Sequence, residues 1–303
     1  GTISYHPWLV MLYLQRRMHP EISRFASHFI YSDLLKTEKR AAEQVQLITD
    51  REPFSKQPLI QVDLTGTYCA ASKNSDNSRF NILSAFIAFQ MALDSEKTGK
   101  HQVGIITPYA LQMRLIKAMI QDYRQHKQTQ IVCSTIHQFQ GSEKEVIIFD
   151  AIESYPFKQP GVLLDKYEDN RVTRLVNVAV TRAKGKLITI SHNRFWENKL
   201  DNKAHPLYRL LKYEQKYGYV ITEEELGHYL KSKTYVPIRY FDQDMYISHL
   251  IKDLNSAKER IRVSLPTGHL VAHVKELEQA ISAAIKRGIN VGIKCKDYEN
   301  LPS

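Results

Sequence analysis

Apolar runs of strand length alternate with amphipathic stretches along the first two thirds of the chain. Such continuous runs are typical of parallel strands that are buried on both faces. Apolar positions three or four residues apart predict helices instead. The alternation predicts an α/β fold with a mostly parallel sheet and helices on both faces. The expected strands are 8–14, 59–66, 103–109, two within 131–150, and 186–192; the expected helices start at Pro20 and cover 79–93, 111–123 and 174–185.

The pattern changes after His192. Helical and charged stretches predict a helical linker over 201–240. From residue 241 a smaller unit follows, in which helix, strand, helix and strand alternate. We therefore expect a large α/β domain in residues 1–200, the linker in 201–240 and a smaller α/β segment in 241–303.

Composition and charge narrow the class of protein. The 303 residues carry a formal net charge of +10, which favours a polyanionic partner: nucleic acid first, an anionic membrane surface second. The three cysteines form no CxxC pair, so the sequence predicts neither a metal site nor a disulfide framework. The most apolar helical run, 80–93, is too short to span a bilayer. A cytoplasmic protein without membrane contact is the resulting expectation.

The segment 174–185 (RLVNVAVTRAKG) is the first candidate for chemistry. Its apolar spacing predicts a short helix that ends near Gly185, with Arg182 in the last turn. A fixed guanidinium group there suits bidentate contact with phosphate oxygens. The alternative is a surface helix whose arginines are only solvated. Lys184 and Lys186 are expected to be solvated charges.

The segment 131–150 (IVCSTIHQFQGSEKEVIIFD) is the second candidate. A polar loop centred on Gln140 and Gly141 separates two apolar strands. Gly141 allows a close backbone approach to a ligand or a positive φ. The Glu143 carboxylate could accept hydrogen bonds from a ribose hydroxyl group.

Two further stretches carry polar residues at strand ends. Arg17 follows the apolar run 8–14, where it either reaches a ligand or serves as an ion-pair residue. Thr107 and Tyr109 stand at the carboxyl end of the strand 103–109, the edge at which α/β sheets bind ligands. For Tyr109 a tyrosine that closes the core is the alternative.

Taken together, 15–22 (QRRMHPEI), 131–150 and 174–185 resemble, in order, three motifs of superfamily 1 helicases of the kind involved in nonsense-mediated decay. The resemblance implies the second RecA-like domain, which has the fold of P-loop NTPases. It also implies roles for single residues. Arg17 and Arg182 would be catalytic and reach the terminal phosphate; Gln140, Gly141 and Glu143 would face the nucleotide; Thr107, Tyr109, Ser134, Thr135 and His137 would face nucleic acid. Arg16 and Glu145 depart from the family pattern, which has an aromatic residue and an aspartate there.

No GxxxxGK[ST] phosphate loop occurs in the sequence. The resemblance therefore implies that ATP and Mg²⁺ are bound mainly by an upstream RecA-like domain, with single-stranded DNA or RNA as the other partner. The expected function is the C-terminal motor domain of an ATP-dependent helicase. A non-catalytic nucleic-acid-binding or scaffold module with a helicase-like fold is the alternative.

The segment 241–303 resembles the first part of a phospholipase-D-like domain. Catalysis in that family needs HxK followed by aspartate, whereas here His273 and Lys275 are followed by Ala280. This difference disfavours a nuclease, a third possible function.

Overall fold

The computed structural model describes residues 13–67, 69–96, 102–139, 141–165, 171–199, 204–232, 243–265 and 274–295. The expected strand 8–14, His273 and Gln140 therefore lie wholly or mostly outside the described residues. The chain divides into two compact units, 1–236 and 237–303, which are described separately.

A six-stranded parallel sheet forms the centre of the first unit, with the strand order β10-β3-β9-β8-β6-β7. It confirms the α/β fold with a mostly parallel sheet that the sequence predicts. The strands are β3 (Leu59–Asp63), β6 (Val103–Thr107), β7 (Val132–Thr135), β8 (Lys144–Asp150), β9 (Ala183–Ser191) and β10 (Tyr219–Ile221).

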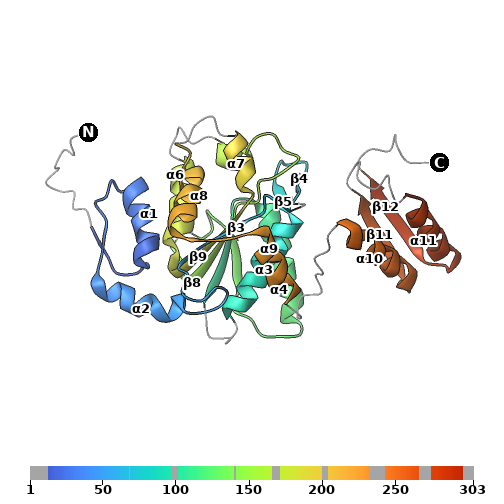
Figure 1. Cartoon of the computed structure of the whole chain (residues 1–303), viewed down its shortest axis with the longest axis horizontal. Helices are drawn as coiled ribbons and strands as arrows, with labels where there is room; N and C mark the ends of the chain where they lie inside the picture. Colours follow the sequence, from blue (N-terminus) through green and yellow to red (C-terminus); the bar gives the residue numbers. More distant parts are fainter. Residues whose placement is uncertain are drawn as a thin grey trace. The chain divides into compact units, whose positions relative to one another are not determined.

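Helices cover both faces of this sheet (Figure 1). Neighbouring strand residues pack into different cores: Ile105 and Ile148 lie in one, Ile106 and Ile147 in the other. This alternation explains why the strands carry apolar residues on both of their faces. The first core is covered by α2 (Lys39–Thr49), α3 (Ile82–Glu96), α4 (Ala110–Arg124) and α9 (Glu223–Lys231), the second by α1 (Pro20–Ile30), α6 (Arg171–Thr181), α7 (Asn193–Lys199) and α8 (Pro206–Tyr217).

Two of these helices start in the same way. His19 precedes Pro20 in α1, and His205 precedes Pro206 in α8. In each case Nδ1 of the histidine accepts a hydrogen bond from the backbone N–H two residues on, at 3.3 and 3.2 Å. The proline supplies a preset φ and has no N–H to satisfy, so each His-Pro pair starts a helix efficiently.

The segment between β7 and β8 crosses the sheet without a helix. Since β6 lies between these two strands, residues 136–143 must pass over β6. Ile136 and Phe139 are buried in the core on that face. A Cβ atom on Gly104 of β6 would lie 2.6 Å from the Phe139 ring, so only glycine leaves room for this crossing.

Residues 206–231, which the sequence assigns to a linker, belong instead to the first unit. β10 pairs with β3 as an edge strand of the main sheet, and α8 packs on the same sheet face as α1 and α6. Glu214 of α8 is fully buried and accepts hydrogen bonds from Thr189 (2.6 Å) and Gln61 (3.3 Å) on the neighbouring strands. Segment 206–231 is therefore part of the α/β layer structure.

The helix predicted over 174–185 ends earlier than expected. α6 ends at Thr181, and Gly185 lies inside β9 rather than at a helix end. A Cβ atom on Gly185 would lie 2.5 Å from Cβ of Ile48 in α2. This glycine is needed for the close approach of a helix, not for a left-handed cap.

Lys186 is not a solvated charge, so that expectation is wrong. The residue is fully buried in β9, and its ammonium group donates to the carbonyl oxygens of Arg51, Pro53 (2.9 Å) and Phe54 (3.2 Å). Burial lowers the pKa of Lys186 to about 8. The loop between α2 and β3 turns three carbonyl groups inward, and this lysine satisfies them.

The second unit is small. It contains α10 (Gln243–Ser256), β11 (Arg260–Leu265), α11 (Val274–Lys286) and β12 (Asn290–Cys295), and the two strands pair in parallel. Leu254, Ile261, Leu277 and Ala284 form its core. In the described parts of both units, no helix has the length and apolar character that a membrane crossing requires.

We predict that Glu214→Gln makes the stability of the first unit less dependent on pH. Burial raises the pKa of Glu214 to about 8. The folded state then keeps a proton that the unfolded state releases, so the free energy of unfolding should fall as the pH rises from about 4.5 to about 8. The effect is a few kcal/mol at most, at about 1.4 kcal/mol for each unit of pKa difference.

Urea unfolding at pH 5 and pH 8, followed by the fluorescence of the buried Trp196, measures this difference. The exposed Glu224→Gln serves as the control. Equal losses of stability between pH 5 and pH 8 in Glu214→Gln and the unmodified chain would contradict the prediction.

Candidate functional site

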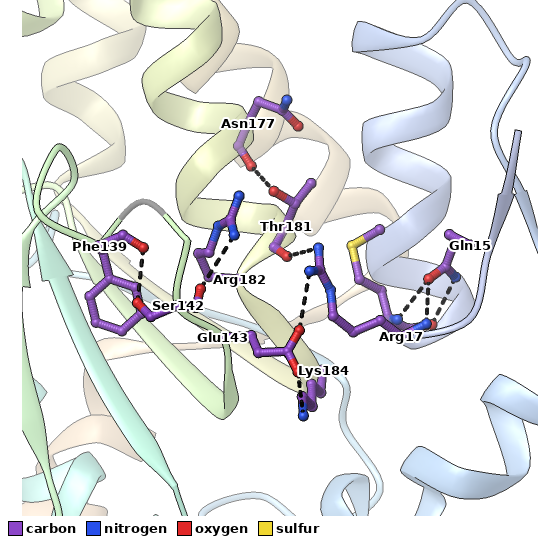
Figure 2. A network of polar contacts seen from close by, with 10 residues as sticks. Gln15, Arg17, Phe139, Ser142, Glu143, Asn177, Thr181, Arg182 and Lys184 are labelled. Atoms are coloured by element: carbon purple, nitrogen blue, oxygen red, sulfur yellow. Dashed lines mark hydrogen bonds and ion pairs between the residues drawn. The ribbon is translucent and has the colours of Figure 1, made fainter. Parts of the chain in front are cut away.

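The Glu143 carboxylate holds two cationic side chains (Figure 2). Its Oε2 lies 3.2 Å from a guanidinium nitrogen of Arg17, and its Oε1 lies 2.6 Å from Nζ of Lys184. The three side chains come from separate places: the segment before α1, the crossing segment and β9. The hydrogen bond from Lys184 contributes most to lowering the pKa of Glu143, and Arg17 acts in the same direction.

Arg17 is held at its backbone and at its guanidinium group. Oε1 of Gln15 accepts hydrogen bonds from the backbone N–H groups of Arg17 (2.9 Å) and Met18 (2.7 Å). At the other end, the guanidinium group donates to the carbonyl oxygen of Thr181 at 2.7 Å. Arg17 thus forms an ion pair, as its alternative interpretation predicts, yet it also points toward Thr181 and Arg182 (Figure 2).

Arg182 lies between α6 and β9, beside the same carboxylate. Its guanidinium group is 3.4 Å from the carbonyl oxygen of Ser142, and its own carbonyl oxygen accepts a hydrogen bond from the N–H of Lys144 (3.0 Å). Burial lowers the pKa of Arg182, as does the charge of Arg17. Nε of Arg17 and Nε of Arg182 are buried and lack hydrogen-bond partners among the described residues.

This cluster lies at the amino edge of the sheet. Lys144 and Ala183, the first residues of β8 and β9, are paired, and Glu143 and Arg182 directly precede them. Gly141, two residues before Glu143, is exposed and has a φ of +85°. Arg182 lies beside a carboxylate that already binds Arg17 and Lys184, so the cluster carries excess positive charge and unused N–H donors. It fits an anion with several oxygens, such as a phosphate chain.

The structure places the other predicted site residues at the opposite edge. Thr107 and Thr135 are paired at the carboxyl ends of β6 and β7. Ser134 and Thr135 are half-buried and His137 is exposed, whereas Thr107 is fully buried. Tyr109 is buried too, and its hydroxyl group donates to Glu153, as the alternative interpretation of a tyrosine closing the core predicts.

Sequence reasoning missed Lys184. The expectation that it is a solvated charge is wrong, because two thirds of its side chain is covered and its ammonium group binds Glu143. Its position in the sequence could have indicated this role. Lys184 stands two residues after Arg182, which was already considered as a candidate, and shortly before the strand predicted over 186–192. The two departures from the family pattern are also paired: Arg16 with Glu38 (3.0 Å) and Glu145 with Arg51 (2.8 Å).

The described residues contain no group of three or more histidine, cysteine, aspartate or glutamate side chains that could hold a metal ion. They therefore do not fit a Mg²⁺ site by themselves. The donors at the amino edge do fit phosphate oxygens, since two arginine Nε groups are buried without a partner in the described part of the chain.

Comparisons with known proteins agree with the motif resemblance. A family model described as "AAA domain" matches residues 4–194, more than half of the chain. The chain is 30% identical to Helicase sen1 from Schizosaccharomyces pombe over 193 residues, which are 61% of this chain and 11% of that protein. It is 28% identical to Regulator of nonsense transcripts 1 from Dictyostelium discoideum over 198 residues, 63% of this chain and 14% of that protein.

A third relative is DNA polymerase alpha-associated DNA helicase A from Schizosaccharomyces pombe. The identity is 27% over 194 residues, 59% of this chain and 27% of that protein. The chain thus spans between 11% and 27% of the length of these three relatives. Together they support a superfamily 1 helicase-like family.

We predict that Lys184→Ala raises the pKa of Glu143 toward its ordinary value, because the variant removes the largest cause of its lowering. At pH values above the ordinary carboxyl pKa, the ion pair stabilises the folded state. This stabilisation is lost as the pH falls through the lowered pKa of Glu143. Removing Lys184 should shift that loss to higher pH. An NMR pH titration of the Glu143 side-chain carboxyl carbon measures the shift.

Arg16→Ala is the matched control, since Arg16 pairs with Glu38 and not with Glu143. An unchanged Glu143 titration in Lys184→Ala would show that the pair does not form in solution.

Proposed function

Because the chain belongs to the AAA-domain family and its relatives include proteins named as helicases, we propose that it is the C-terminal motor domain of an ATP-dependent superfamily 1 helicase acting on DNA or RNA. The observation that carries the proposal is the cationic cluster at the amino edge. Arg17 and Lys184, which come from separate segments, bind one carboxylate, and Arg182 lies beside it, with arginine donors left over. A module that only binds or scaffolds nucleic acid does not need these donors.

In this proposal Arg17 and Arg182 act on the terminal phosphate of a nucleotide. Phosphoryl transfer develops charge on the phosphate oxygens, and a positioned guanidinium group stabilises that charge. Gln15 and the Thr181 carbonyl group fix the direction of Arg17, and the Ser142 carbonyl group lies within hydrogen-bond reach of Arg182. Such groups act in the transition state with little reorganisation.

The nucleotide-facing roles of Gln140, Gly141 and Glu143 belong to the same proposal. Glu143 holds Arg17 and Lys184 through its two oxygens, so it sets the spacing of the cations as well as offering an acceptor to a ribose. Bound ATP and Mg²⁺ would supply the reacting phosphate and a counter-charge. Their main binding groups, a phosphate loop and acidic residues, are assigned to an upstream RecA-like domain, which completes the cleft.

The carboxyl edge is proposed to contact single-stranded nucleic acid. Ser134, Thr135 and His137 are half-buried or exposed polar residues there, and the buried Thr107 pairs with Thr135 on the neighbouring strand. We assign residues 1–200 to the motor domain, with β10 extending its sheet and α8 covering one face, and 241–303 to a partial phospholipase-D-like domain.

We predict that the 303-residue chain alone hydrolyses no ATP, with or without single-stranded nucleic acid. It has no phosphate loop, and its described residues offer no acidic cluster for Mg²⁺. Phosphate release under excess ATP is the measurement. Turnover that persists in an Arg17→Ala, Arg182→Ala double variant would mean that the catalytic machinery lies elsewhere in the chain.

In a full-length protein that includes the upstream domain, we predict that Arg182→Ala lowers ATP turnover by about 10³-fold or more, the typical contribution of such an arginine. Arg182→Lys should restore little, because an ammonium group cannot form the bidentate contact. Arg17→Ala should have a similar effect, and the double variant should be little worse than either single one.

Arg174→Ala is the control, because Arg174 is an exposed arginine on α6, the helix that Arg182 follows. Lys184 cannot serve as the control, since it binds Glu143. Near-normal kcat in Arg182→Ala would overturn its assignment.

A further inference from the structure

An exposed aromatic side chain lies beyond the carboxyl edge of the sheet. Tyr155 follows β8 by a few residues and is 70% exposed. It differs in this from Tyr109, the tyrosine that the sequence predicted to contact nucleic acid, which is 4% exposed and engaged with Glu153. The edge therefore has an aromatic ring available to a ligand, and it belongs to Tyr155.

The loop that carries Tyr155 is firmly held. Glu153 is buried, and its carboxylate accepts hydrogen bonds from the Tyr109 hydroxyl group, the Arg79 guanidinium group and the N–H of Gly161 (2.9 Å). Arg79 also donates to the carbonyl oxygen of Gln159 (3.0 Å), and its guanidinium carbon lies 4.0 Å from the ring centre of Phe157. The loop 153–161 is thus tied to β5 (Arg79–Asn81) and to the end of β6.

The backbone at Tyr155 itself is fixed as well. Its carbonyl oxygen accepts a hydrogen bond from the N–H of Ala71 at 2.8 Å, and Ala70 and Tyr155 form an isolated parallel bridge. A ring on a restrained backbone that stays in solvent loses little conformational entropy when a flat partner packs on it. Tyr155 is therefore prepared for contact, whereas most exposed tyrosines on a surface have no such support.

Exposed basic residues stand close in sequence to the two residues of this bridge. Lys73 lies three residues beyond Ala70 in β4 (Ala71–Lys73), and Lys158 lies three residues beyond Tyr155; both are exposed. The half-buried Ser134 and Thr135 end β7 at the same edge of the sheet. Ammonium and hydroxyl groups bind backbone phosphates, and an aromatic ring binds a base, the combination that sequence-tolerant single-strand binding uses.

We propose that Tyr155 stacks on a base of single-stranded nucleic acid bound along the carboxyl edge of the sheet. The proposal rests on the proposed function and adds to it the residue that contacts the base. Single strands are the substrate because their bases are free to stack, whereas the bases of a duplex are already stacked and paired. Glu153 acts as a positioning residue, since it ties the loop to Tyr109 and Arg79.

The test uses the 303-residue chain and fluorescence anisotropy with two labelled probes. One is a single-stranded oligonucleotide; the other is a strand of equal length that has the sugar-phosphate backbone but no bases. Tyr155→Ala should weaken binding of the first probe by roughly 5- to 150-fold, as expected for one stacked base, and leave binding of the second unchanged. Tyr155→Phe should keep the affinity of the unmodified chain, because it keeps the ring.

Tyr217→Ala is the matched control: Tyr217 is 45% exposed and ends α8 on another part of the first unit. The unfolding curve of Tyr155→Ala should coincide with that of the unmodified chain, since the Tyr155 side chain is exposed. If the chain binds the oligonucleotide in a salt-dependent manner and Tyr155→Ala binds it equally well, the stacking inference fails while the proposed function stands. An equal loss on both probes also overturns stacking. If the unmodified chain binds neither probe at low salt, the nucleic-acid part of the proposed function fails as well.

Discussion

The strand order of the main sheet is the constraint on which both candidate surfaces depend. β7 lies outside β6, and β8 lies on the other side of β6, so the chain must cross the sheet between them. In a parallel sheet this crossing starts at the carboxyl edge and must end at the amino edge before the next strand can begin. The segment 136–143 makes the passage with a single polar loop. One stretch of sequence therefore supplies polar residues to two opposite edges.

The pairing of β8 with β9 then completes the amino edge. Because the two strands start side by side, Glu143 and Arg182 become neighbours although they are far apart in the sequence. The segment before α1 joins them through the hydrogen bond from the N–H of His19 to the carbonyl oxygen of Lys184, at 2.7 Å. Arg17 is brought to Glu143 by this backbone contact. The candidate site is thus formed where β8 and β9 begin, and the pairing of these two strands fixes the backbone positions of its residues.

The sequence was sufficient for the architecture because buried parallel strands leave a strong signal. The runs in β3, β6, β8 and β9 are mostly apolar, with Gln61, Lys186 and Thr189 among the exceptions, and the turns between them are polar. The edge strand β10 left a weaker signal, since three residues next to a charged helix look like a linker. Arg17 and Arg182 could be singled out as candidates because they stand in segments that resemble helicase motifs, whereas residue type alone left an ion pair or solvation open.

Other features could not be predicted because they depend on what a side chain meets across the fold. Lys184 and Lys186 are two residues apart and chemically alike, yet one pairs with a carboxylate and the other is enclosed by three carbonyl groups. Gly185 has the sequence context of a helix cap, and only the position of α2 reveals its role. The burial of Tyr109 is coupled to Glu153, a partner that spacing along the chain does not reveal.

The contact between Gly104 and Phe139 has a consequence for how this chain can vary during evolution. The strand β6 lacks a side chain at the point where the Phe139 ring crosses it, and the space is filled by that ring. A larger residue at position 104 would push the crossing segment off the sheet, and a smaller residue at 139 would leave a cavity. The two positions therefore tolerate change only as a pair. Among homologous sequences they should covary, with an alanine or larger residue at 104 accompanied by loss of the aromatic ring at 139.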